Sequence, residues 1–213
     1  MDPDALLERL VQVGILAEAE SEDRLVLSDS FRATVEEQTN PDDACGVPDH
    51  CPQPIRDRPE LLALFTTTRE RVPDLSWPDM TRTTLVLDQF RRGYPRTDGV
   101  PDGFVPVHGD RLPVYGTLHR KAVVYVWSDD CEPCDLMREE LGALDEEADD
   151  ETALLAVCGP ENAEFLYDEY GIEGAPTTLF LLDGRVDVRL FGPKPLSDLR
   201  TQLSTLEELH STR

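Results

Sequence analysis

Apolar and polar positions follow two different periods along residues 121–209. Short continuous apolar runs predict buried strands, and apolar residues spaced three and four apart predict amphipathic helices between them. Asp183-Gly184 is a turn pair that favours a hairpin. The expected elements are strands at 122–127, 153–158, 177–182 and 185–191, and helices at 132–148, 161–170 and from about Pro195 onward. This alternation predicts an α/β fold.

The residues before 121 carry mostly helical patterns. The expected elements are a helical pattern over 4–19 broken at Gly14, a strand at 25–27, a helix capped by Ser28 or Ser30 that carries Phe31 and Val35, and helices at 60–71 and from Ser76 to Gly93. We therefore expect four parts: an N-terminal helical extension at 1–40, a Cys/Pro-rich linker at 41–59, a helical segment at 60–103 and an α/β domain at 104–213. The order of elements in 1–40 faintly resembles a winged-helix fragment.

Two short apolar runs precede the regular part of the chain. Phe104–Val107 and Leu112–Tyr115 are joined by Gly109-Asp110-Arg111, which suits a turn. The pattern predicts two short strands that form a hairpin.

Two cysteines lie at the junction between the first regular strand and the helix after it. Cys131 and Cys134 are separated by Glu132 and Pro133. Cys131 falls at a helix N-terminus, where free backbone N–H groups and the helix dipole favour a thiolate. Cys134 follows one turn later and can attack a mixed disulfide. A zinc site usually needs a second pair of ligands, so the motif indicates thiol–disulfide exchange, with Cys131 as nucleophile and Cys134 as resolving thiol.

The motif, the order of elements and the stretch Tyr170–Thr178, which contains Gly174-Ala175-Pro176, together resemble thioredoxin. The resemblance implies a thioredoxin fold, with a central mixed sheet flanked by helices. It implies a cis bond at Pro176 beside the cysteines, and a groove in which the Ala175 backbone pairs with an extended substrate. It also implies disulfide oxidoreductase activity on protein thiols and disulfides, recharging by a reductase that the sequence does not identify, and no cofactor besides the Cys131–Cys134 disulfide.

The residues around the motif depart from the thioredoxin pattern. Asp130 replaces the family's aromatic residue, Glu132-Pro133 replaces Gly-Pro, and Trp127 matches the family's tryptophan. Negative charges near Cys131 disfavour its thiolate, and salt screens them. We therefore expect Cys131 to be less acidic than in ordinary thioredoxins and more reactive at high salt.

A second departure concerns the buried acid that helps thioredoxins deprotonate the resolving cysteine. Tyr125 stands at its position, and its lysine partner is replaced by Ala156 or Val157. The acid and its partner are lost together, which puts fast general reduction of protein disulfides in doubt.

The net charge of the chain bears on the environment in which this protein works. The formal net charge is −24, and Lys121 and Lys194 are the only lysines. We interpret this composition as halophilic, because molar salt shortens the screening length to about 3 Å. It argues against nucleic-acid partners, which require a basic surface. No apolar stretch is long enough to span a membrane, and the acidic N-terminus lacks the features of a secretory signal, so we expect a cytoplasmic protein that binds no membrane.

The remaining cysteines leave several interpretations open. Cys45, His50 and Cys51 form a loop cluster, which could hold unpaired thiols, a second redox pair of Cys45 with Cys51, or a metal site completed by Asp49; we assign no metal. Cys158 ends an apolar strand and is expected in the core. Two alternatives to catalysis are a non-catalytic module that binds partners through the thioredoxin groove and a redox sensor.

Overall fold

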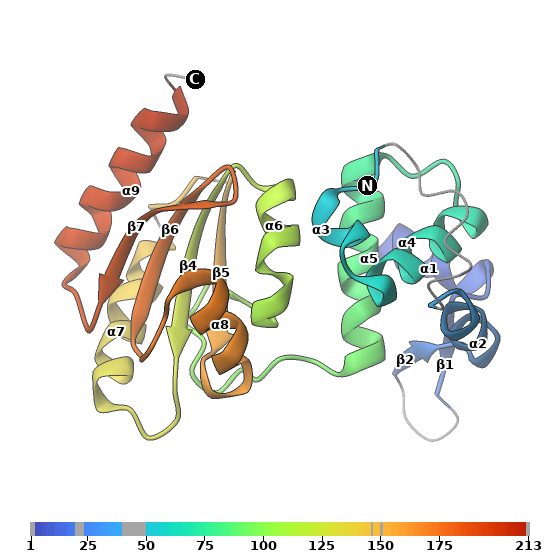
Figure 1. The fold of residues 1–213 in the computed structure, drawn as a ribbon, viewed down its shortest axis with the longest axis horizontal. Coiled ribbons are helices and arrows are strands. Elements are labelled where there is room, and N and C mark those ends of the chain that lie inside the picture. Colours follow the sequence, from blue (N-terminus) through green and yellow to red (C-terminus); the bar gives the residue numbers. More distant parts are fainter. Residues whose placement is uncertain (1–2, 20–23, 40–49, 146, 150, 212–213) are drawn as a thin grey trace. The chain divides into compact units, whose positions relative to one another are not determined.

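The computed structural model describes residues 3–19, 24–39, 50–145, 147–149 and 151–211, and the chain divides into two units between Tyr94 and Pro95. The first unit is Met1–Tyr94 and the second is Pro95–Arg213 (Figure 1). The finer division into extension, linker and helical segment stays a prediction.

The first unit is helical apart from one small sheet. Its elements are α1 (Pro3–Gln12), β1 (Leu16–Glu18), β2 (Leu25–Leu27), α2 (Asp29–Gln38), α3 (Gln53–Arg56), α4 (Pro59–Arg71) and α5 (Trp77–Arg92). Strands β1 and β2 pair antiparallel. The helical pattern expected to continue after Gly14 is wrong, because residues 16–18 pair with 25–27 and this pairing outweighs the local spacing.

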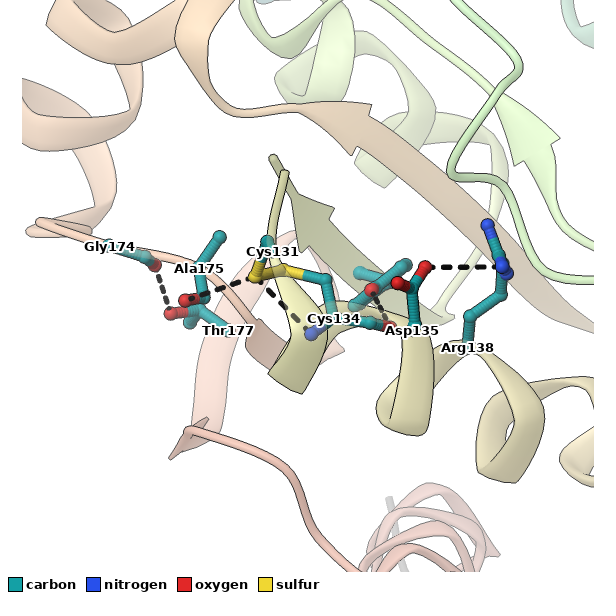
Figure 2. Close-up of a disulfide and its surroundings, with 8 residues drawn as sticks. Cys131, Cys134, Asp135, Arg138, Gly174, Ala175 and Thr177 are labelled. Carbon is teal, nitrogen blue, oxygen red and sulfur yellow. Dashed lines mark hydrogen bonds and ion pairs between the residues drawn. A yellow bond between two sulfur atoms is a disulfide. The ribbon is translucent and has the colours of Figure 1, made fainter. Parts of the chain in front are cut away.

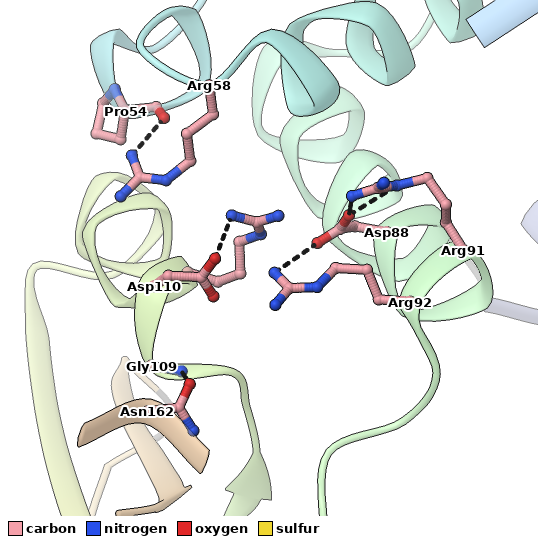
Figure 3. A network of polar contacts seen from close by, with 9 residues as sticks. Pro54, Arg58, Asp88, Arg91, Arg92, Gly109, Asp110 and Asn162 are labelled. Carbon is pink, nitrogen blue, oxygen red and sulfur yellow. Dashed lines mark hydrogen bonds and ion pairs between the residues drawn. The ribbon is translucent and has the colours of Figure 1, made fainter. Parts of the chain in front are cut away.

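Serine caps begin two helices of the first unit. Ser28 Oγ accepts a hydrogen bond from the Phe31 N–H, and Ser76 Oγ accepts one from the Asp79 N–H. The caps supply acceptors for backbone donors that the first helical turn leaves free. Near the end of α5 the buried Asp88 accepts a hydrogen bond of 2.7 Å from Arg91 (Figure 3). This ion pair satisfies a carboxylate that would be costly to bury alone.

The second unit contains a five-stranded mixed sheet with helices on both faces (Figure 1). Its elements are β3 (Val105–Pro106), the 3₁₀ turn Gly109–Arg111, α6 (Leu112–Leu118), β4 (Lys121–Trp127), α7 (Glu132–Leu144), β5 (Thr152–Cys158), the 3₁₀ turn Pro160–Asn162, α8 (Ala163–Tyr170), β6 (Thr177–Leu182), β7 (Arg185–Phe191) and α9 (Leu196–Ser211). The strand order is β3-β5-β4-β6-β7. Strands β3, β5 and β4 run parallel to one another; β6 pairs antiparallel with β4, and β7 pairs antiparallel with β6.

The central strand β4 is buried on both faces, so its alternate residues enter two cores. Val123, Tyr125 and Trp127 pack with residues of α7 and α9. Val124 and Val126 pack on the other face with residues of α6 and α8. The Cys131 motif follows the end of this strand, so a rigid and fully buried element positions it.

The hairpin expected at 104–115 is wrong. Residues 112–118 form a helix, and the short strand β3 pairs parallel with β5 at the sheet edge. Pro113 lies in the first turn of α6, where its missing N–H costs nothing. A four-residue apolar run suits either structure, and here Leu112 and Val114 are buried from a helix.

The helix expected at 132–148 ends at Leu144. The residues after it are mostly acidic. Negative side chains are unfavourable at the negative end of a helix dipole, so the chain leaves the helix there.

Candidate functional site

Cys131 and Cys134 form a disulfide at the N-terminus of α7 (S–S 2.09 Å, Cα–Cα 5.2 Å). Cys131 is the N-cap residue, and its Sγ accepts a hydrogen bond of 3.2 Å from the Cys134 N–H (Figure 2). A sulfur at this position faces the free N–H groups of the first turn, which stabilise negative charge. The reduced Cys131 thiol therefore lies where a thiolate is favoured.

The two sulfurs differ in exposure. Cys134 is 5% exposed and belongs to the core beneath α7, whereas Cys131 is only partly buried. A substrate can therefore reach Cys131 but not Cys134. The geometry allows the first to exchange with an outside disulfide and the second to act only within the chain.

The loop before β6 lies against Cys131. The Ala175–Pro176 peptide bond is cis, and the Ala175 carbonyl oxygen lies 3.9 Å from Cys131 Sγ (Figure 2). Thr177 Oγ1 donates a hydrogen bond of 2.7 Å to the Gly174 carbonyl, which closes the loop. Pro176 is buried and Ala175 is partly exposed, so backbone beside the disulfide remains accessible.

Tyr125 connects β4 to the first turn of α7. Its side chain is fully buried, and its hydroxyl donates a hydrogen bond of 2.8 Å to the Cys134 carbonyl. Burial raises the pKa of Tyr125, so the hydroxyl stays protonated at neutral pH. Its partner in the parallel register with β5 is Ala156, so Ala156 rather than Val157 lies directly beside it. Neither side chain can take a proton from Cys134 at neutral pH.

Residues 95–103, which we call the strap, form part of the site although no motif marked them. Gly99 packs directly on Trp127; a Cβ at Gly99 would lie 2.3 Å from the indole ring. Arg138 Nη1 donates a hydrogen bond of 3.1 Å to the Asp98 carbonyl, which fastens the strap to α7. A cavity of about 500 Å³ opens between them; its lining includes Asp98, Gly99, Tyr125, Trp127, Cys131 and Cys134.

Some of the acidic residues around the disulfide are paired with arginine. Asp129 accepts two hydrogen bonds from Arg96, at 2.6 and 2.8 Å, and Asp135 lies 3.1 Å from Arg138. Asp130 is exposed and adopts a left-handed conformation (φ 49°) directly before Cys131. Glu132 and Pro133 are exposed in the first turn of α7. Both arginines were missed in the sequence, where no spacing relates them to the cysteines.

The loop cluster near residue 50 is only partly visible. Cys45 lies outside the described residues, so its pairing with Cys51 stays a prediction. Cys51 is buried, which raises the pKa of its thiol, and its Sγ lies 3.9 Å from the Pro52 carbonyl oxygen. Cys158 is buried at the end of β5, as its apolar run predicts.

In the described part of the chain, no three His, Cys, Asp or Glu residues lie close enough together to hold a metal ion. Nor does any helix in this part combine the length and apolar character needed to cross a bilayer.

Comparisons with known proteins found a family match and similar solved structures. The sequence model of the thioredoxin family matches residues 116–205. A search of curated proteins found no match. Similar solved structures include a mutant thioredoxin from Halobacterium salinarum (19% identity, 50% of this chain and 94% of that chain, TM-score 0.43) and thioredoxin f2 from Chlamydomonas reinhardtii (21%, 48% and 94%, 0.43). Mitochondrial thioredoxin 3 from Saccharomyces cerevisiae is another (17%, 48% and 95%, 0.44).

Proposed function

Because residues 116–205 belong to the thioredoxin-like superfamily, we propose that the protein is an oxidoreductase that reduces or forms protein disulfides through Cys131 and Cys134. The observation that carries the proposal is the disulfide at the start of α7. Its outer sulfur is accessible beside the Ala175 backbone, and its inner sulfur is buried.

In the reducing direction the Cys131 thiolate attacks one sulfur of a substrate disulfide. A mixed disulfide forms, and the other substrate sulfur leaves as a thiolate that takes a proton from water. Cys134 then loses its proton and attacks Cys131 Sγ. The Cys131–Cys134 disulfide forms and the second substrate thiol leaves, so two electrons pass to the substrate.

The proposed substrate is an extended segment of a protein that carries a disulfide or dithiol. Ala175 is partly exposed, so its backbone is available to pair with such a segment. No bound cofactor takes part, since the two sulfurs carry the electrons. A separate reductase, of unknown identity, must return the site to the dithiol state. We propose that the protein works in the cytoplasm at high salt and binds neither nucleic acid nor membranes.

Insulin reduction by dithiothreitol in molar KCl tests the proposal. Wild-type protein should accelerate it, and Cys131→Ser should abolish the acceleration. Reduced Cys134→Ser protein, freed of dithiothreitol and mixed with insulin, should retain a mixed disulfide on Cys131, which mass spectrometry detects after digestion. Cys51→Ser is the control for a change of cysteine away from the motif and should keep the activity.

The same variants separate the alternatives. Retained acceleration in Cys131→Ser would contradict the proposed function. A wild-type protein that captures partners but does not accelerate reduction would indicate a binding module. A Cys51→Ser variant that loses activity would instead favour a second redox pair in the 45–51 loop.

A further inference from the structure

We propose that Arg96 is a positioning residue of the redox site, which holds Asp129 and offsets its charge so that more of the reduced Cys131 is ionised at neutral pH. The proposal rests on the proposed function, because it concerns the same nucleophile. Arg96 lies outside the stretch that matches the thioredoxin family, so nothing in that match assigns it a role.

The first argument is the geometry of the ion pair. Arg96 Nη1 and Nη2 donate hydrogen bonds of 2.6 and 2.8 Å to the two Asp129 carboxylate oxygens, which makes the ion pair bidentate. Arg96 Nη2 also bonds Asp98 at 3.0 Å. Charge-assisted contacts of this kind fix orientation as well as adding energy. Asp129 is therefore held in place two residues before Cys131.

The second argument is that Arg96 is itself held. Its guanidinium carbon lies 5.5 Å from the centre of the Trp127 ring, within the range of a cation–π contact. Gly99 packs on the same indole and Val100 packs against the core beneath α7. These contacts hold the strap in place close to Arg96. The arginine is therefore already positioned before a substrate binds.

The third argument is the conformation between Asp129 and Cys131. Asp130 has a left-handed backbone, a region that aspartate tolerates better than most residues but that still carries strain. The Arg96–Asp129 contact fixes the residue before it, and the N-cap geometry of Cys131 fixes the residue after it. The contact therefore fixes the position of the Asp129 and Arg96 charges relative to Cys131.

The charges around the sulfur determine the sign of the electrostatic effect. The acidic residues that line the cavities beside Cys131 and Ala175 come from the strap, the loop before α7, α7 itself and the loop before β6: Asp98, Asp129, Asp130, Glu132, Asp135 and Glu173. The cations are Arg96 and Arg138, and the backbone N–H of Lys194 contacts Met137 of α7. The other titratable groups nearby are Tyr125, Cys158 and Glu161, which lies 3.9 Å from Arg96. Removing Arg96 takes away a positive charge and leaves the Asp129 carboxylate without its partner, and both changes make the thiolate less favourable.

Substitution of Arg96 by Gln and by Lys separates charge from shape. The rate at which iodoacetamide alkylates Cys131, located by mass spectrometry and followed against pH in reduced protein, gives the pKa of that thiol without any substrate protein. In Arg96→Gln at low salt, the alkylation rate at neutral pH should fall about twofold, the effect of one unit charge about 10 Å away in water. Arg96→Lys should recover most of that rate, and molar KCl should remove the difference.

Arg120→Gln is the matched control. Arg120 forms a similar exposed pair with Asp183 (2.9 Å) beside the start of β4, and its removal should leave the Cys131 profile unchanged. An unchanged profile in Arg96→Gln would overturn the proposal, as would equal shifts in the Gln and Lys variants or a shift that persists in molar KCl. Failure of insulin reduction with a normal alkylation result would contradict only the proposed function.

Discussion

The hydrogen bond from the Tyr125 hydroxyl to the Cys134 carbonyl predicts that removal of this hydroxyl lowers the free energy of unfolding. Tyr125→Phe removes only the hydroxyl from a fully buried side chain and keeps the ring in the core. A buried hydrogen bond contributes about 1 kcal/mol net, and the cost rises when the remaining partner is left unsatisfied. The Cys134 carbonyl lies inside α7 and keeps its helical acceptor role, so we expect the free energy of unfolding to fall by about 1 kcal/mol.

Urea unfolding of the oxidised protein measures this difference, and the melting temperature should fall by about 4 °C for a domain of this size. Burial raises the pKa of Tyr125, so the hydroxyl is disfavoured as an anion in the folded state. Its contribution is then constant below the ordinary tyrosine pKa of about 10 and declines as the pH rises above that value. The difference between wild type and Tyr125→Phe should therefore be flat across neutral pH and shrink in strong alkali.

Tyr167→Phe is the control for loss of a hydroxyl, because Tyr167 is 58% exposed on α8. Its stability should match that of wild type. A Tyr125→Phe protein as stable as wild type, or a difference that already varies between mild acid and neutral pH, would refute the assignment of the hydroxyl as a buried donor to Cys134.

Two further predictions concern the ends of the sheet away from the disulfide. Asp149→Asn removes the partner of the buried Lys121 and should cost about 2 kcal/mol, less than a fully buried pair because the Asp149 side chain is 45% exposed. The hydrogen bond from Lys121 lowers the pKa of Asp149, so the difference in urea stability should be full above about pH 4 and vanish as the pH falls through the lowered value; a pH-independent difference would contradict it. Gly116→Ala would place a Cβ 2.7 Å from the Gly184 Cα and should lose about 1–3 kcal/mol. Gly142→Ala, where the nearest atom lies at 3.8 Å, should instead gain about 0.5–1 kcal/mol in the same assay; equal effects would argue against the close approach.

The regular half of the chain could be predicted from sequence because its signals are strong and agree with one another. The strands at 121–127, 152–158 and 177–182 contain apolar runs of four residues or more, and each strand is buried along its whole length. The helix N-terminus at Cys131 follows from a strand that ends shortly before a proline in the next first turn. In these elements the local propensity and the burial pattern favour the same secondary structure, so tertiary contacts did not change the predicted element.

Residues 95–118 were harder because their structure depends on partners distant in sequence. The run 112–115 is too short for its period to distinguish a helix from a strand. The strap has no period of its own, and its position depends on contacts with Trp127, Arg138 and Asp129. A glycine that must lie against an indole looks like any turn glycine in the sequence. The part of the site that the strap contributes could therefore not be predicted from the sequence.

Tyr125 stands where the resemblance to thioredoxin implies a buried acid, so the second step of the proposed reaction needs another proton acceptor. Cys134 must lose a proton before it attacks Cys131, and its buried neighbours Tyr125 and Ala156 cannot accept one. The cavity of about 500 Å³ beside Cys134 is lined by Asp98 and Asp135, so we expect the proton to leave through solvent that enters this cavity. A thiol loses its proton to solvent more readily as the pH rises. Release of the mixed disulfide, followed by mass spectrometry, should then continue to accelerate as the pH rises from neutral into mild alkali, rather than level off at the pKa of a buried carboxyl.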